Sequence, residues 1–242
     1  MKKYCPIKLI KSAAYHHGDL KEALITTALK MLQKIPATEL SLRELSRQAG
    51  VSQAAPYRHF KNKEALLAAI SQQGFELKLK YMMEAVAAVG NDASEALYAC
   101  AEAYLKMATL HPEHFKIMSS STVLPTDEHP ALLASAQDTF MFLLSVVERA
   151  QKAGVLGAGD PAHRGMHCWI MVHGFSTLFA EKRLDWMGVT PENARLAIRV
   201  LISQYITGAS TDLAPNLFNF QLFQTDYSKH YMQLLMERLK KG

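Results

Sequence analysis

Hydrophobic positions recur every three or four residues along most of the chain, which is the spacing of one face of an α-helix. Leu67, Ile70, Leu77 and Tyr81 form one such stripe. No stretch of four to eight residues alternates strictly between apolar and polar side chains with turn signals on both sides, as a half-buried strand would. The pattern therefore predicts an all-α protein.

Capping residues and prolines mark where the helices start. Ser41 and Glu44 have the spacing of a capping box, in which the Ser hydroxyl accepts a hydrogen bond from a backbone N–H one turn into the helix. A first-turn proline costs little because its missing N–H has no helical partner, and four such starts occur, at His111-Pro112, His129-Pro130, Asp160-Pro161 and Thr190-Pro191. Together these signals predict helices over 19–34, 41–48, 52–59, 62–89, 93–110, 112–119, 130–153, 161–184 and 191–209, and a further one over 227–240.

The second and third predicted helices are short and are separated only by Ala49, Gly50 and Val51. Glycine is a common residue just beyond a helix C-terminus, and Ser52 is a favourable N-cap for the next helix. This layout is that of a helix-turn-helix, whose second helix enters the major groove of DNA. We expect the motif to occupy about residues 41–60.

Charge is concentrated in the same part of the chain. The 242 residues carry 27 Lys+Arg against 22 Asp+Glu, a net charge of +5. Residues 1–64 hold 12 basic and 5 acidic side chains, a net charge of +7, whereas residues 65–242 have a net charge of −2. A basic module of this kind favours a polyanionic partner such as double-stranded DNA.

The side chains of the predicted motif divide into inward and outward sets. In the helix over 41–48, Leu42 and Leu45 are expected to face the core together with Ala49, while Arg43 and Arg47 share a face toward the phosphates. We expect the following Phe60 to be a core residue.

The helix predicted over 52–59 carries Gln53, Tyr57, Arg58 and His59, which can all donate to phosphates or base edges. Pro56 is unusual there, because at the fourth helical position it removes an early hydrogen bond and crowds the preceding carbonyl.

The runs LSLRELSRQAGVS over 40–52 and PYRHFKNKEALL over 56–67 resemble the DNA-binding domain of the TetR family of transcriptional regulators. The resemblance spans about residues 16–67 and departs from the commonest pattern at Ala54-Ala55-Pro56, where Gly and an aliphatic residue are more usual. Further on, Trp169 with His173-Gly174 resembles a TetR subgroup whose C-terminal domain carries a Trp-His-Gly signature.

The resemblance implies two domains and a mode of action. It implies a three-helix DNA-binding domain with a basic N-terminal arm over 1–64, and a helical ligand-binding and dimerisation domain over 65–209. Residues 210–242 have no counterpart in the usual family layout, and we expect them to be a C-terminal extension that is part helix. The implied function is that of a ligand-responsive regulator, most often a repressor, that binds a palindromic operator as a homodimer. The odd number and wide spacing of the cysteines favour a reducing, cytoplasmic location.

Roles for individual residues follow from the same resemblance. Arg43 and Gln53 would read base edges, with Arg58 as a third reader. The phosphate contacts would come from Ser41, Ser52, Tyr57, His59 and Lys63, and Ala54 would also lie at the DNA surface.

Candidate effector-pocket residues are the aromatic and Met side chains of the central helices, because such walls adapt to varied apolar ligands. The expected set is Tyr81, Tyr104, Met107, Phe115, Met118, Phe140, Leu144, Trp169 and His173. The same spacing is equally compatible with ordinary core or dimer packing.

Other functions find less support in the sequence. The three cysteines, Cys5, Cys100 and Cys168, are far apart and indicate neither a disulfide framework nor a zinc knuckle. His163 and His167 lack a third metal ligand on their helix face, so we expect no metal and no cofactor.

No catalytic motif occurs, and no apolar stretch reaches the roughly 18–20 residues that span a membrane. We therefore expect neither an enzyme nor a membrane protein. Two alternatives remain: an architectural DNA-binding protein without ligand control, and an all-α enzyme carrying a basic module, with chemistry at His163, His167, Cys168 and His173.

Overall fold

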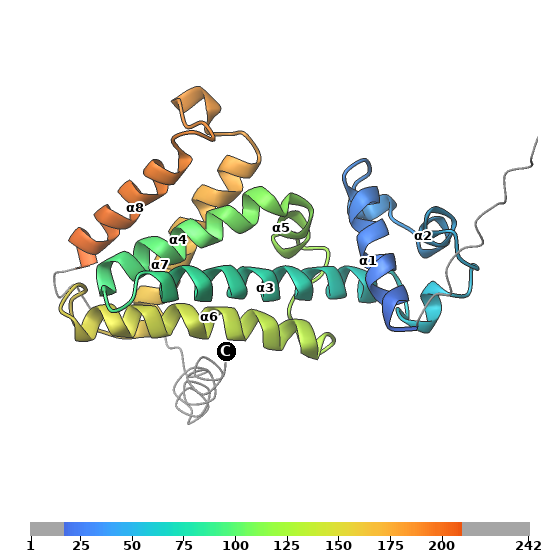
Figure 1. The fold of residues 1–242 in the computed structure, drawn as a ribbon, viewed down its shortest axis with the longest axis horizontal. Helices are drawn as coiled ribbons and strands as arrows, with labels where there is room; N and C mark the ends of the chain where they lie inside the picture. Colours follow the sequence, from blue (N-terminus) through green and yellow to red (C-terminus); the bar gives the residue numbers. More distant parts are fainter. Residues whose placement is uncertain (1–16, 210–242) are drawn as a thin grey trace, which may run out of the picture. The chain divides into compact units, whose positions relative to one another are not determined.

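A computed structural model describes residues 17–209, and all regular structure in this range is helical, as predicted (Figure 1). The α-helices are α1 (His17–Leu32), α2 (Leu42–Ala49), α3 (Lys63–Ala88), α4 (Ala93–Leu110), α5 (Pro112–Met118), α6 (Pro130–Lys152), α7 (Pro161–Ala180) and α8 (Ala194–Ala209). Three 3₁₀ helices join them: η1 (Ala37–Glu39), η2 (Pro56–Arg58) and η3 (Asp185–Met187). The N-terminal arm, the C-terminal extension and the helix predicted over 227–240 lie outside the described residues.

The chain forms two compact units that divide between Leu66 and Leu67, close to the boundary expected after residue 64. The first unit contains α1, η1, α2, η2 and the first residues of α3. The second contains the rest of α3 and the helices α4 to α8. Helix α3 therefore contributes residues to both units.

A small apolar core holds the first unit together. Leu24 and Ala28 of α1 are fully buried, as is Leu45 of α2, and the two helices are in contact. Phe60 is only 2% exposed, which confirms its predicted core position. This core fixes α2 and the turn after it on the side of α1.

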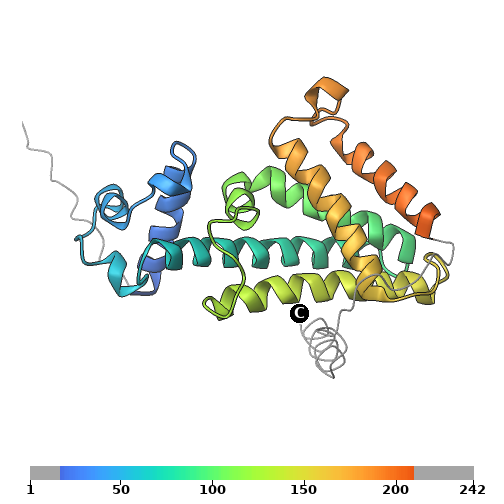
Figure 2. The ribbon, with the colours of Figure 1, turned by 180° about the vertical axis from the view of Figure 1, so that it is seen from behind.

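Helix α4 is the centre of the second unit. It contacts α5, α6, α7 and α8, and the views of Figures 1 and 2 agree that α3 runs beside both α4 and α6. Its buried side chains point in every direction and many are small: Ala93, Ala96, Leu97, Ala99, Cys100, Ala101, Ala103, Tyr104, Leu105, Met107 and Ala108. Small side chains let the neighbouring helices approach closely, so one helix can be enclosed by the others.

An ion-pair network ties α8 to α4 at the edge of this core. The Arg199 guanidinium donates to Glu95 at 2.7 Å and to Glu102 at 2.8 Å, and Arg195 donates to Glu102 at 2.7 Å. Arg199 also lies over the Tyr98 ring, 4.3 Å from its centroid. Because several charges share the network, it fixes the position of α8 better than an isolated surface pair would.

By length and composition α6 could cross a membrane. In this fold it packs against α4 and α7, and half of its most apolar window is buried inside the protein. These contacts are those of a core helix in a globular domain.

Two predicted limits of α-helices differ from the structure by three residues or more, and the other limits differ by at most two. Helix α7 ends at Ala180 rather than 184, because Lys182 adopts a left-handed conformation with φ of 57° and ends the helix. Helix α8 begins at Ala194 rather than 191, because a turn that includes the Asn193 side chain, which accepts from the Thr190 N–H, precedes it.

Gly50 provides a first test of this fold, because its φ of 69° lies in the left-handed region. We expect Gly50→Ala to destabilise the first unit by about 1 kcal/mol and Gly50→Asn to cost less, since Asn tolerates this conformation. Hydrogen exchange of the α1 and α2 amides measures the loss. Equal protection in the wild type and the Ala variant would contradict the assignment.

Candidate nucleic-acid interface and ligand cavity

The turn after α2 is built by local hydrogen bonds. The Glu44 N–H donates to Ser41 Oγ at 3.2 Å, so the predicted N-terminal cap is present. At the other end, the Gly50 N–H is directed to carbonyls of the last turn, and the Val51 N–H donates to the Ser46 carbonyl at 3.0 Å. These bonds stop α2 and turn the chain toward the next segment.

That segment is not the regular α-helix predicted over 52–59. Residues 53–55 form a turn, and only Pro56–Arg58 are helical, with 3₁₀ geometry. Pro56 has no N–H to donate to the Ser52 carbonyl, which instead accepts from the Ala55 N–H at 3.0 Å. The i→i+3 pattern continues with the Arg58 N–H donating to the Ala55 carbonyl at 3.2 Å.

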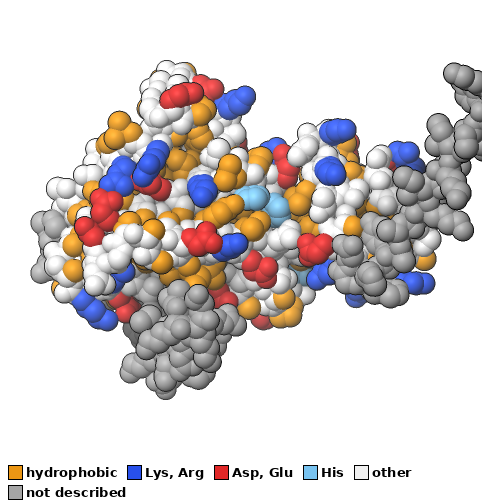
Figure 3. Space-filling model, viewed as in Figure 1, with side chains coloured by type: hydrophobic (Ala, Val, Ile, Leu, Met, Phe, Trp, Pro, Cys, Tyr) orange, Lys and Arg blue, Asp and Glu red, His pale blue; other side chains and the backbone are white. Residues whose placement is uncertain are grey.

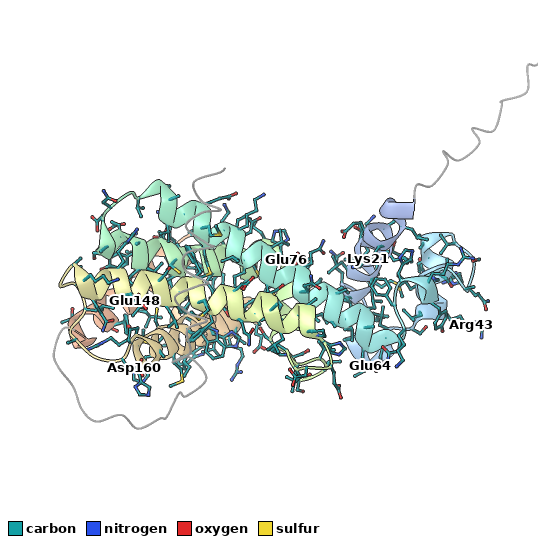
Figure 4. The ribbon with its side chains drawn as sticks, turned by 90° about the horizontal axis from the view of Figure 1, so that it is seen from below. Lys21, Arg43, Glu64, Glu76, Glu148 and Asp160 are labelled. Atoms are coloured by element: carbon teal, nitrogen blue, oxygen red, sulfur yellow. The ribbon has the colours of Figure 1, made fainter. Side chains whose placement is uncertain are left out.

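The side chains expected to meet DNA lie mostly on the surface of the first unit, where Lys and Arg side chains are visible in Figure 3. Arg43 points outward from α2 (Figure 4). The Tyr57 side chain is also exposed, at 56%, so its ring is available for contact rather than packed in the core. The exposed candidates are Ser41, Arg43, Ser52, Gln53, Ala54, Tyr57 and Arg58.

His59 and Lys63 are partly buried and already have neighbours. The His59 ring lies beside Phe60, with 6.4 Å between the ring centroids. Lys63 Nζ donates to the Thr38 carbonyl at 3.0 Å. An ammonium group has three donors, so this bond leaves others for a phosphate.

Arg43 and Arg47 differ in charge environment although both are exposed. Arg47 makes a bidentate pair with Glu44, through Nε at 2.9 Å and Nη2 at 2.6 Å, and Gln48 donates to the same carboxylate. The hydrogen bond from Arg47 lowers the pKa of Glu44 to about 2. Glu44 thus offsets the Arg47 charge, whereas Arg43 has no such acidic partner in the part of the chain that the structure describes.

The second unit contains a cavity of about 400 Å³ between α3, α4, α6 and α7. Its wall is almost entirely apolar, with one charged side chain, Lys78, and a Pro from the loop before α6. The lining residues in the described range are Phe75, Lys78, Met82, Cys100, Ala101, Tyr104, Pro125, Leu133, Ala136, Gln137, Thr139, Phe140, Leu143, Met166, Cys168, Trp169 and Val172.

Of the expected pocket residues, Tyr104, Phe140 and Trp169 line this cavity. Met107 and Phe115 are buried in the surrounding core. Met118 and Leu144 lie against Gly74 and Gly165. Tyr81 lines a separate pocket. His173 does not line the cavity but forms a hydrogen bond with the lining residue Tyr104.

The hydrogen bond between His173 and Tyr104 joins α7 to α4. The Tyr104 hydroxyl oxygen lies 2.8 Å from His173 Nδ1, and the Trp169 ring centroid lies 5.8 Å from that of His173. Burial lowers the pKa of His173, with a smaller effect from Lys78, and burial raises the pKa of Tyr104. Both groups are therefore neutral at pH 7, and they fix one aromatic wall of the cavity.

Phe75, Lys78 and Met82 on α3 are lining residues that the expected set lacks. Their spacing of three and four residues places them on one helix face. The signal available in the sequence was Lys78 itself, a basic residue within an otherwise apolar stripe. Its position in a cavity wall could not be predicted, because the cavity forms only where α3, α4, α6 and α7 pack together.

The residues considered for metal binding or catalysis do not converge. His163 Nδ1 lies 3.6 Å from Asp160 Oδ2, His167 is exposed, and Cys168 is buried with its pKa raised to about 12. Across residues 17–209, no three His, Cys, Asp or Glu side chains are grouped so that they could hold a metal ion. Cys100 and Cys168 are both free.

Two family profiles match the chain, one for each unit. Residues 24–70 match the bacterial regulatory proteins of the tetR family, and residues 97–202 match the tetracyclin repressor-like C-terminal domain. The chain is also 46% identical over 52 residues to the class C tetracycline repressor protein of Escherichia coli. That alignment spans 22% of this chain and 24% of the length of the curated relative.

Solved structures share the fold over most of the chain. A protein of unknown function from Rhodococcus sp. RHA1 is 29% identical, with a TM-score of 0.72, and the match covers 83% of this chain and 100% of that one. AibR in complex with isovaleryl coenzyme A and operator DNA is 23% identical, with a TM-score of 0.55, over 69% of this chain and 95% of that one.

The two profiles follow one another in the order of the two units, and the first includes the capped helix, the glycine turn and η2. The second includes Trp169, His173 and the cavity wall contributed by α4, α6 and α7. The chain belongs to the TetR family of bacterial regulatory proteins.

Proposed function

We propose that this protein is a cytoplasmic, ligand-responsive repressor that binds a palindromic DNA operator as a homodimer. The observation that carries the proposal is the exposed set of donors around the turn between α2 and η2, on a unit joined by α3 to a cavity-containing helical unit. AibR, which shares the fold, has been crystallised with both a coenzyme A thioester and operator DNA.

The proposed DNA surface combines cationic side chains, among them Arg43, with neutral hydrogen-bond donors such as Gln53. Arg43 and Gln53 are suited to base edges, because guanidinium and amide groups can make two hydrogen bonds to one base. Tyr57, Arg58 and Lys63 are suited to phosphates, which position the protein without reading sequence. The short 3₁₀ turn at Pro56–Arg58 carries two of these side chains, Tyr57 and Arg58, and both are exposed.

A homodimer is supported by an apolar surface on α7 and α8. Leu196 and Val200, one turn apart on α8, are 66% and 48% exposed, and Ile170 and Trp169 on α7 are also exposed. Exposed apolar side chains grouped on two neighbouring helices are typical of an isologous dimer interface.

Ligand control follows from the position of α3. This helix supplies Phe75, Lys78 and Met82 to the cavity wall, and its first residues belong to the DNA-binding unit. A ligand that fits one arrangement of the cavity better than another would favour that arrangement. We propose that the favoured arrangement places the two recognition elements at a spacing other than the roughly 34–36 Å of one DNA turn.

DNA readout is tested with Gln53→Ala and Lys63→Ala on an operator selected from random duplexes. Loss of Gln53 should weaken specific binding by about 1–3 kcal/mol and leave non-specific binding unchanged. Loss of Lys63 should weaken binding to all sequences and reduce the salt slope by about 1. Fluorescence anisotropy at several salt concentrations measures both effects.

Lys116→Ala is the matched control, because Lys116 is an exposed lysine of the second unit, paired with Glu113 on its own helix. It should bind the operator like the wild type. Unchanged affinity in both the Gln53 and the Lys63 variants would rule out the proposed DNA surface.

The dimer interface is tested with Leu196→Glu. A buried, unpaired carboxylate at the centre of an apolar interface opposes association, so we expect the 27.0 kDa monomer in place of the dimer. Sedimentation velocity gives the mass. Leu124 is also an exposed leucine, in the loop before α6, and the Leu124→Glu variant should remain dimeric. A dimeric Leu196→Glu variant would place the interface elsewhere.

A further inference from the structure

We propose that the cavity binds an amphipathic monoanion, an apolar body with one carboxylate, and that Lys78 holds the carboxylate. This inference rests on the proposed function, in which the cavity is the effector site, and it adds the chemical class of the effector. The ligand class follows from two features of the cavity: a buried amine, which favours an anionic group, and an apolar wall, which favours a hydrocarbon body.

Lys78 is a buried cation without an anion. Its side chain is 4% exposed, and it lines the cavity from α3. Its Nζ lies 4.4 Å from the Phe75 ring centroid and 4.7 Å from the Tyr104 ring centroid. No Asp or Glu is among the described side chains that line the cavity.

The titratable groups that face Lys78 leave its charge uncompensated. On α4, burial raises the pKa values of Cys100 and Tyr104, so both are neutral at pH 7. On α7, burial raises the pKa of Cys168 and lowers that of His173, so these are neutral as well. Burial lowers the pKa of Lys78 itself to about 7. An anion in the cavity would supply the partner that the protein does not.

The rest of the wall suits a hydrocarbon body. Met82, Leu143, Met166 and Val172 are aliphatic, and Phe140 adds an aromatic surface. The hydroxyl of Thr139 is already engaged, because it donates to the Ser135 carbonyl at 2.8 Å. Apart from the exposed Gln137, the wall thus offers one charged contact, Lys78, and many apolar ones, which is the complement of a carboxylate on an apolar chain or ring.

The experiment measures binding to the full-length protein by isothermal titration at pH 6.5. The ligands are octanoate, 1-octanol and octylammonium, which share one chain and differ in head group, together with 4-butylbenzoate as a carboxylate of different shape. We expect at least one carboxylate to bind ten-fold or more tightly than 1-octanol, and octylammonium to bind most weakly.

Lys78→Met keeps a side chain of similar length and removes the charge. It should bind the preferred carboxylate at least ten-fold more weakly while its affinity for 1-octanol stays unchanged. Lys80→Met is the matched control, because Lys80 lies on the same helix with its side chain 67% exposed. It should bind every ligand like the wild type.

The pH profile separates charge from shape. In the free protein the Lys78 amine loses its proton as pH rises through about 7. Carboxylate affinity should therefore be highest near about pH 6 and fall as pH rises through 7 to 9, because the neutral amine must then take up a proton to pair with the carboxylate. The Lys78→Met variant should lack this fall. Its circular dichroism and ligand-free operator binding should match the wild type, which excludes misfolding as the cause.

Three results would overturn the proposal: equal affinity for carboxylates and 1-octanol, an unchanged carboxylate preference in Lys78→Met, or failure of both carboxylates to bind at millimolar concentration. Operator binding is measured separately. If the protein binds no DNA, the proposed function fails whatever the cavity binds; if it binds DNA and no carboxylate, only the ligand class fails.

Discussion

The enclosure of α4 by its neighbours is the constraint on which the second unit depends. Its alanines allow α5 to α8 to approach it, and its larger residues, Leu97 and Met107, fill the spaces between them. Where α4 faces α3, α6 and α7, the same packing leaves a space lined by Ala101 and Tyr104 rather than a filled core. The cavity is thus a product of how the helices surround α4.

Local signals explain why most of the fold could be predicted from the sequence. Caps at Ser41 and Asp160 and prolines at the helix starts act within one turn, so they are readable without tertiary structure. The recognition segment was the exception, because Pro56 changed the hydrogen-bond pattern from α to 3₁₀. The sequence shows a proline at this position, but whether a helix tolerates Pro56 depends on the surrounding core.

The cavity was harder to predict from the sequence, because residues that line a cavity and residues that fill a core recur at the same helical spacing of three or four positions. Tyr104 and Met107 lie on the same helix and are both apolar and buried, yet only Tyr104 reaches the cavity. His173, a predicted pocket residue, does not line the cavity; it forms a hydrogen bond with the Tyr104 hydroxyl and holds that side chain in place. Periodicity identifies which face of a helix is buried, whereas the partner that the face meets is set by residues distant in sequence.

Trp169 belongs to two surfaces at once. Its ring packs edge-on against Phe140 in the cavity wall, while 41% of the residue is exposed on the helix proposed to meet a second subunit. In a dimer, any movement of the Trp169 side chain on ligand binding would change the contacts between the two subunits. Because such coupling is reciprocal, effector affinity would depend on protein concentration, and association of the subunits would be an equilibrium that the effector itself shifts.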